Sequence, residues 1–217
     1  MTSFNVQESE VKISIGEEVL NGNLSIPEGA SKIVLFAHGS GSSRFSPRNT
    51  YVAKLMNKKG FATLLMDLLT VDEERVDEIT AEFRFDIDLL AKRLVEATQW
   101  LKANKKIRFS IGYFGASTGA AAALIAAAKL PEDAKAVVSR GGRPDLAAEY
   151  LPKVKAPTLL IVGGDDLEVL QMNRDALKQI HAEKKLEVVP GATHLFEEPG
   201  NLQEAAELAI DWFVKHL

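Results

Sequence analysis

Two kinds of apolar pattern follow one another along this chain. In residues 10–15 and 19–26, apolar and polar positions alternate around a polar turn at 16–18, which predicts an antiparallel hairpin with one buried face. From residue 32 onward the pattern changes to short continuous apolar runs, each followed by a stretch of helical periodicity. Continuous apolar runs are typical of parallel strands that are covered on both faces.

This alternation predicts an α/β fold. After the hairpin, the expected strands cover residues 32–37, 61–67, 107–114, 134–139, 158–162 and 186–189. The expected helices cover residues 47–60, 85–102, 118–130, 170–181 and 202–215. Right-handed crossovers between such strands build a mostly parallel sheet with helices on both faces. We expect one domain over residues 1–217, because this length supports one sizeable core and is short for two domains.

One stretch interrupts the alternation. Residues 71–82 are acidic and contain only scattered apolar side chains. They separate the second buried strand from the helix expected over residues 85–102. We expect this stretch to form a mobile excursion or a short lid.

Composition narrows the range of partners. The net charge is -4 and no block of Lys and Arg is concentrated anywhere, which argues against nucleic acid or an anionic membrane and favours a small-molecule substrate. The chain has no cysteine, which excludes disulfides and cysteine-based metal sites and fits a reducing compartment. We find no leader pattern at the start and no apolar run that could span a bilayer, so we expect a cytoplasmic protein. The oligomeric state stays open.

A G-x-S-x-G motif lies between the third of the continuous apolar runs and an alanine-rich helical stretch. A strand, a sharp turn with Ser117 and a helix form the context of a nucleophile elbow. Such a turn strains the serine backbone, and Gly115 and Gly119 leave room because neither carries a Cβ that would collide with the neighbouring strand or helix. The amide of Thr118, at the start of the helix, is placed to stabilise negative charge on a substrate oxygen. The alternative is an ordinary turn serine.

A serine nucleophile needs a base, and the chain offers four histidines. His194 lies in a loop after the last strand and before the last helix, where an imidazole reaches the carboxyl edge of the sheet. We therefore favour His194 as the base over a structural role. His38 directly follows a buried strand, which favours a structural hydrogen-bonding role beside the site. We expect His181 and His216 to face solvent.

The base in turn needs an acid that holds its tautomer. Asp165 and Asp166 follow the strand over residues 158–162 and both qualify. Because neighbouring side chains point in opposite directions, only one of the two can face His194, and we choose Asp166. The alternative is a plain glycine-rich turn without a catalytic role.

In chain order, the segments around Ser117, Asp166 and His194 resemble the nucleophile, acid and histidine segments of the α/β-hydrolases. The compact size, the lack of a large cap insertion and the loop over residues 38–44 look most like the dienelactone hydrolase-like branch. The resemblance covers essentially the whole chain from about Val19 onward. Typical dienelactone hydrolases use a cysteine nucleophile, and this chain has none. This departure puts the dienelactone substrate in doubt and leaves ester hydrolysis intact.

The resemblance implies a role for each residue of the site. Ser117 would be the nucleophile, His194 the general base and acid, and Asp166 the residue that orients His194. The backbone N–H groups of Ser40 and Thr118 would form the oxyanion hole. The implied reaction is two-step acyl transfer that cleaves a carboxylic ester, or a lactone, of a small molecule without a metal or an organic cofactor.

Further side chains at strand ends are candidates for substrate binding. They are His38, Arg44, Arg140 and Arg143. The arginines suit a carboxylate-bearing substrate, and the alternative is that they tie loops to carbonyl groups or surface acids. Two other functions compete with ester hydrolysis: a non-catalytic ligand-binding protein on the same fold, and a thioesterase, amidase or acyltransferase with the same triad.

Overall fold

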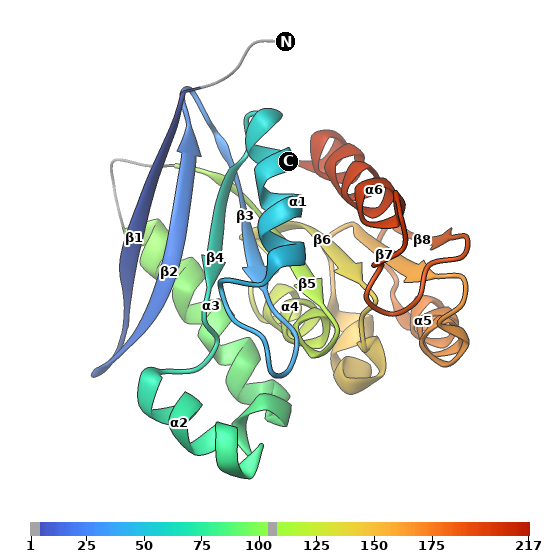
Figure 1. Ribbon diagram of the computed structural model, residues 1–217, viewed down its shortest axis with the longest axis horizontal. Helices are drawn as coiled ribbons and strands as arrows, with labels where there is room; N and C mark the ends of the chain where they lie inside the picture. Colours follow the sequence, from blue (N-terminus) through green and yellow to red (C-terminus); the bar gives the residue numbers. More distant parts are fainter. Residues whose placement is uncertain (1–4, 104–107) are drawn as a thin grey trace.

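The computed structural model describes residues 5–103 and 108–217, which form an eight-stranded sheet with helices on both faces (Figure 1). The expected start of the elbow strand, Ile107, lies outside the described residues. In chain order the elements are β1 (Val6–Ile15), β2 (Glu18–Pro27), β3 (Lys32–Ala37), α1 (Pro47–Lys58), β4 (Ala62–Met66), α2 (Val71–Thr80), η1 (Phe83–Phe85), α3 (Ile87–Ala103), β5 (Ser110–Ala116), α4 (Thr118–Lys129), β6 (Ala134–Arg140), η2 (Pro144–Lys153), β7 (Thr158–Gly163), α5 (Leu167–Gln179), β8 (Lys184–Val189) and α6 (Asn201–His216).

The order of the strands in the sheet is β1-β2-β4-β3-β5-β6-β7-β8. β1 pairs antiparallel with β2, and β2 pairs antiparallel with β4. The strands from β4 to β8 are parallel to one another. The α/β fold with an antiparallel hairpin at the start of a mostly parallel sheet is therefore confirmed.

The continuous apolar runs fill two cores at once. Along β3, Ile33 and Leu35 point into the core on one face of the sheet, while Val34 and Phe36 point into the core on the other face. Alternate side chains of a strand point to opposite faces, so a strand between two helical layers must be apolar at every position. α3, α4 and α5 cover the first face, and α1 and α6 cover the second (Figure 1).

The middle of the sheet contains a switch in the direction of winding. The chain passes from β3 outward to β4 and then returns to β5 on the other side of β3. The loop after β3 leads to α1 on one face, and the loop after β5 leads to α4 on the opposite face. Where successive loops diverge in this way, a crevice opens at the carboxyl ends of the strands.

Most of the stretch over residues 71–82, which was expected to form a mobile excursion or a short lid, forms the helix α2 that the sequence pattern did not predict. A capping box begins the helix: the Thr70 side chain accepts from the Glu73 amide, and the Glu73 carboxylate accepts from the Thr70 amide. Arg93 then pairs with Glu73 at 2.6 Å and holds the helix against α3. The T-x-x-E pattern in the sequence was the signal for this helix start. Its role as a lid stays a prediction.

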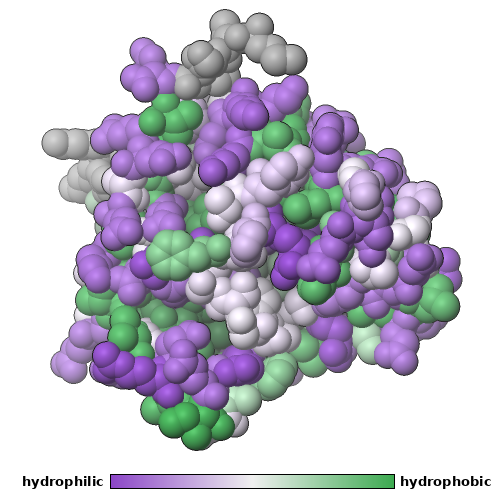
Figure 2. Space-filling model, viewed as in Figure 1, coloured by the Kyte–Doolittle hydropathy of each residue, from purple (hydrophilic) through white to green (hydrophobic). Residues whose placement is uncertain are grey.

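The outer surface of α2 carries exposed apolar side chains beside charged ones such as Asp72, Arg75 and Glu78. Val76 is 45% exposed and Ile79 is 88% exposed, and apolar side chains gather over α2 at the lower edge of the view in Figure 2. The hydrophobic positions of α2 are thus not used for the core. This explains why periodicity alone did not predict the helix.

Two further elements differ from the sequence expectation. β1 begins at Val6, four residues before the expected hairpin strand, and most side chains in this added part are exposed polar groups. An edge strand with polar side chains has little apolar alternation for the sequence pattern to detect. Between β6 and β7, η2 covers residues with no predicted element, and it begins with Pro144 in its first turn.

A buried hydroxyl pair joins β5 to α3. The Thr98 hydroxyl donates to the carbonyl oxygen of Leu94 at 2.8 Å, so its single proton is used. The Tyr113 hydroxyl lies 2.8 Å from Thr98 Oγ1 and must therefore be the donor of that contact. Both side chains are fully buried. This pair fixes the strand that leads into the elbow.

The direction of this bond predicts that removing the donor and removing the acceptor change the free energy of unfolding by different amounts. In Tyr113→Phe, Thr98 keeps its bond to Leu94, so we expect the free energy of unfolding to fall by only about 1 kcal/mol. In Thr98→Val, the buried Tyr113 hydroxyl loses its acceptor, so we expect a fall of about 2–3 kcal/mol. Urea unfolding of both variants and of the double variant tests this. An equal or larger loss in Tyr113→Phe would contradict the assigned direction.

Candidate active site

Ser117 lies in the sharp turn between β5 and α4. Its backbone has φ 52° and ψ -124°, a region that non-glycine residues rarely adopt. A Cβ on Gly115 would lie 2.4 Å from the Ala120 Cα, and a Cβ on Gly119 would lie 2.3 Å from the carbonyl oxygen of Ala37. The predicted strain at the serine and the need for both glycines are therefore confirmed. The turn presents a partly exposed hydroxyl at the carboxyl edge of the sheet.

The loop after β3 lies directly beside the elbow. A Cβ built on Gly39 would lie 3.1 Å from the Cβ of Ser117, so the two backbones are in close contact. In the described part of the chain, the amides of Ser40 and Thr118 donate to no other group. Two unused N–H donors close to a serine hydroxyl are the components of an oxyanion hole.

His38 holds this loop in place. Its Nε2 accepts the amide proton of Leu68 at 3.2 Å, so the ring proton is on Nδ1, which donates to the carbonyl oxygen of Gly39 at 2.9 Å. Burial lowers the pKa of the His38 imidazole and keeps it neutral. The structural hydrogen-bonding role expected for His38 is thus what the geometry gives. Because it fixes the Gly39 carbonyl, it also fixes the peptide that carries the Ser40 amide.

Asp166 is the acid that contacts the candidate base. Its Oδ2 lies 2.7 Å from Nδ1 of His194, whereas Asp165 is exposed to solvent. The Asp165 amide donates to the carbonyl oxygen of Ala192 at 3.0 Å and ties the acid loop to the histidine loop. His194 and Ser117 line the same pocket. No hydrogen bond joins these two described residues directly. Such contacts often close only when substrate is bound.

The histidine loop is fixed from two sides. The Glu198 carboxylate accepts from the Thr193 hydroxyl at 2.6 Å, from the Thr193 amide at 3.2 Å and from Asn201 Nδ2 at 3.3 Å. These bonds, chiefly the one from the Thr193 side chain, lower the pKa of Glu198 to about 2. On the other side of His194, Phe196 is buried with a positive φ of 57°.

The three candidate arginines differ in their partners. Arg44 forms an ion pair with Asp67 and also donates to it from its backbone amide at 2.8 Å. Arg143 forms a two-bond ion pair with Asp145 at 2.9 and 2.8 Å. Arg140 instead lines the pocket of Ser117 and His194. Arg44 and Arg143 therefore fit the alternative of tying loops to acids, and Arg140 does not.

The first turn of α1 contributes to this pocket, although the sequence pattern did not predict this contribution. Ser46 caps α1 by accepting from the amide of Asn49, and both residues line the pocket together with Arg48 and Ser42. The sequence predicted a helix from residue 47, but not that its first turn reaches the site. The signal was position: α1 begins a few residues after the loop of His38.

The remaining two histidines lie elsewhere. His181 is exposed, as expected. The expectation for His216 was wrong, because its side chain is only 9% exposed and its ring packs 4.4 Å from that of Trp212. Burial lowers the pKa of His216. Its place in the last turn of an amphipathic helix explains the contact.

Two features are absent from the described residues. Residues 5–103 and 108–217 contain no cluster of three His, Asp or Glu side chains that could hold a metal ion. No helix in the same ranges is both long enough and apolar enough to cross a membrane.

Comparison with known proteins agrees with this geometry. Residues 20–217 match the Dienelactone hydrolase family, and the chain belongs to that family. The crystal structure of a dienelactone hydrolase from Anabaena variabilis is 60% identical in sequence, with 98% of this chain and 99% of that chain covered and a TM-score of 0.96. Est1E from Butyrivibrio proteoclasticus, 16% identical with a TM-score of 0.80 over 95% of this chain and 98% of that chain, shares the α/β-hydrolase fold. The similarity to Est1E concerns the fold alone.

The names of two curated relatives refer to a different activity from that of the dienelactone hydrolase family. Two proteins from strains of Mycobacterium tuberculosis, each called a putative phosphoribosyl transferase, are 54% identical over 213 residues. The match covers 98% of this chain and 47% of each relative, so the chain spans about half the length of the curated relatives it matches.

The environment of Glu198 predicts a pH-dependent contribution to stability. A carboxylate whose pKa is lowered from 4.5 to about 2 adds stability that is fully present above about pH 4.5 and is lost as the pH falls through about 2. Glu198→Gln should therefore lower the Tm at neutral pH, and the gap to the wild type should narrow toward pH 2. Thermal unfolding across this range is the measurement. Glu204→Gln, at an exposed position of α6, controls for the loss of one charge. A gap that does not change with pH would contradict the role of the charged carboxylate.

Proposed function

We propose that this protein hydrolyses carboxylic esters of small molecules through an acyl-enzyme on Ser117. The observation that carries the proposal is the 2.7 Å contact between His194 Nδ1 and Asp166, with His194 and the strained Ser117 lining one pocket. An ordinary turn serine has no need of strained backbone, an oriented imidazole and two unused amides together. Membership of the dienelactone hydrolase family adds support.

Each residue has one task in the proposed reaction. The Asp166 carboxylate accepts the Nδ1 proton of His194 and leaves Nε2 free to take the proton of the Ser117 hydroxyl. The Ser117 oxygen attacks the ester carbonyl, and the amides of Ser40 and Thr118 stabilise the oxyanion.

The leaving group and the second half-reaction use the same groups. His194 gives its proton to the departing alcohol, and the acyl group stays on Ser117. A water molecule then loses a proton to His194 and attacks the acyl-enzyme. The bond to Ser117 breaks, His194 returns the proton to the serine oxygen, and the acid is released.

The name of the curated relatives does not change this proposal. Those proteins are about twice as long as this chain, and the part that matches is the hydrolase family segment. Thioesters and amides are alternative substrates for the same triad, because selectivity between them lies in the shape of the pocket. Kinetics with an ester, a thioester and an amide of the same acyl group separate these possibilities.

Ser117→Ala should abolish hydrolysis of short p-nitrophenyl esters. Without the nucleophile we expect kcat to fall by about a thousandfold or more. A fluorophosphonate probe should label the wild type, and mass spectrometry should locate the adduct on Ser117. If a folded wild-type protein shows no turnover and no adduct, the result favours the non-catalytic alternative.

Asp166→Asn should lower kcat by about 10³–10⁴-fold, because an amide in place of the carboxylate favours the wrong tautomer of His194. Asp165→Asn is the matched control, since this neighbouring carboxylate is exposed and does not contact the imidazole. Steady-state kinetics of both variants with one ester are sufficient. Equal losses in the two variants would contradict the assignment of the acid.

A further inference from the structure

Arg140 is a buried cation that has no acidic partner among residues 5–103 and 108–217. Its side chain lies at the end of β6, and the residue is 6% exposed. Within the described chain, its Nε and Nη1 are buried and have no hydrogen-bond partner, and its Nη2 reaches Asn49 Oδ1 only at 3.5 Å. The Arg140 guanidinium carbon also lies 5.7 Å from the centroid of the Phe196 ring. Burying a guanidinium in this way is unfavourable unless an anion pairs with it for part of the time.

The other buried or half-buried arginines near the site show the usual solution. Arg44 pairs with Asp67, Arg84 with Asp77, and Arg143 with Asp145. A structural role for Arg140 would predict the same kind of partner. Its hydrogen-bonding capacity instead remains unused next to the reacting groups.

The pocket around Arg140 is rich in donors for an anion. It has a volume of about 260 Å³ and contains both Ser117 and His194. Among its described lining residues are a second guanidinium, that of Arg48, and the hydroxyls of Ser40 and Ser42, and none is an acid. The positive end of α1 also faces it, because Ser46, Arg48 and Asn49 form the start of that helix.

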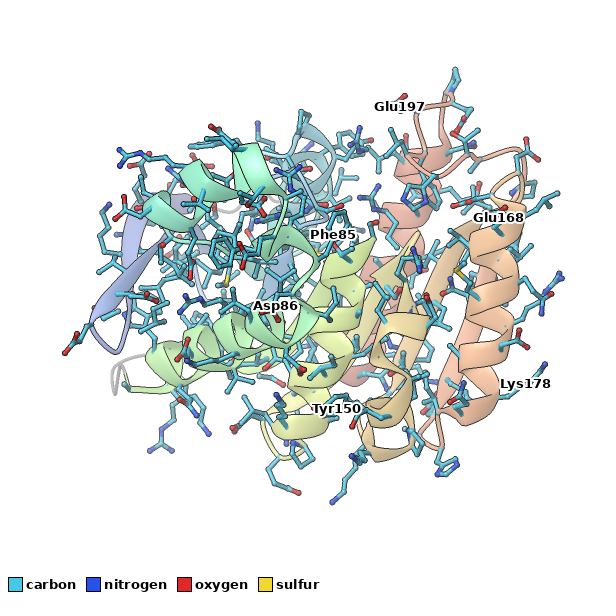
Figure 3. All side chains as sticks on the ribbon, turned by 90° about the horizontal axis from the view of Figure 1, so that it is seen from below. Phe85, Asp86, Tyr150, Glu168, Lys178 and Glu197 are labelled. Atoms are coloured by element: carbon cyan, nitrogen blue, oxygen red, sulfur yellow. The ribbon has the colours of Figure 1, made fainter. Side chains whose placement is uncertain are left out.

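The acid that pairs with Arg48 lies outside the pocket. Glu197 contacts Arg48 at 3.0 Å, and its side chain is 63% exposed. Figure 3 shows Glu197 at the outer edge of the molecule, on the loop that precedes α6 in the chain. An exposed pair of this kind is weak and exchanges partners readily.

We propose that Arg140, together with Arg48, binds a phosphate group carried by the ester substrate. The inference rests on the ester hydrolysis proposed for Ser117 and names its substrate class. A phosphate monoester has nearly two negative charges and three terminal oxygens, which match two guanidinium groups and the neighbouring hydroxyls. A planar carboxylate has one charge and two oxygens and would leave part of this donor set unused. The phosphate lies on a part of the substrate that does not react.

The test compares three acetate esters that differ only at the far end of the alcohol, which carries a phosphate, a carboxylate or a neutral hydroxyl. We expect kcat/KM of the wild type to be at least about tenfold higher for the phosphate ester than for the neutral ester. This ratio should fall to near one in Arg140→Gln and in Arg48→Gln. Arg143→Gln is the matched control, because its guanidinium pairs with Asp145 and does not line the pocket, and it should keep the ratio. If Arg140→Gln does not fold, Arg48→Gln carries the test.

Binding measured without turnover separates this inference from the proposed function. Calorimetry of the phosphorylated alcohol with Ser117→Ala should detect binding that is lost in Ser117→Ala with Arg140→Gln. A ratio near one in an active wild type would overturn the phosphate site and leave ester hydrolysis standing. A preference for the carboxylate ester would overturn the phosphate assignment. If no ester is cleaved and the probe does not label Ser117, the proposed function fails, and calorimetry alone then decides whether phosphate binds.

Discussion

The site depends on one close contact between backbones, where the end of β3 meets the turn between β5 and α4. A Cβ on Gly119 would overlap the carbonyl oxygens of Ala37 and His38, each at 2.3 Å, and the neighbouring Gly39 packs on Ser117. No side chain fits between these segments, so the nucleophile and the amides beside it are positioned by main-chain atoms. The switch in strand order brings β3 and β5 together and sends their loops to opposite faces. The crevice and its chemistry follow from this arrangement.

The arginines around the pocket are paired with acids, whereas the pocket itself contains a buried arginine. Acids outside the pocket neutralise Arg44, Arg84 and Arg143, while burial keeps His38 neutral. Arg140 is left as the buried charge beside the nucleophile, and burial together with nearby Arg48 lowers its pKa to about 10. At neutral pH the guanidinium therefore stays charged. A positive environment next to Ser117 also favours the negative charge that develops on a substrate oxygen during acyl transfer.

Sequence patterns were sufficient where one physical demand dominated. Strands buried on both faces must be apolar throughout, so β3 to β7 could be predicted, and the elbow required glycines at fixed positions on both sides of Ser117. The rule that neighbouring side chains diverge limited the acid to one of Asp165 and Asp166 but did not select between them. The fold shows that Asp166 is the one in contact with His194. The sequence placed the start of α1 close to the loop of His38, but whether Arg48 reaches the pocket depends on how α1 packs against the sheet. It also could not show that Arg143 pairs with Asp145 while Arg140 has no acidic partner among the described residues, because side-chain contacts depend on the fold.

The helix α2 and the histidine loop show a second limit of local patterns. Among the described non-glycine residues, positive φ occurs at Ala81, Ser117 and Phe196. Ala81 ends α2, and the other two lie at the nucleophile and two residues after His194. At Phe196 the sequence offers no glycine, so the strain must be offset by packing: the ring is buried with α6, and the Glu198 bonds hold the loop on its other side. Strained positions at the proposed nucleophile and two residues after the proposed base are typical of sites held by the whole fold. The geometry of Ser117 and His194 therefore depends on the stability of the sheet and of α6, and not on local sequence preference alone.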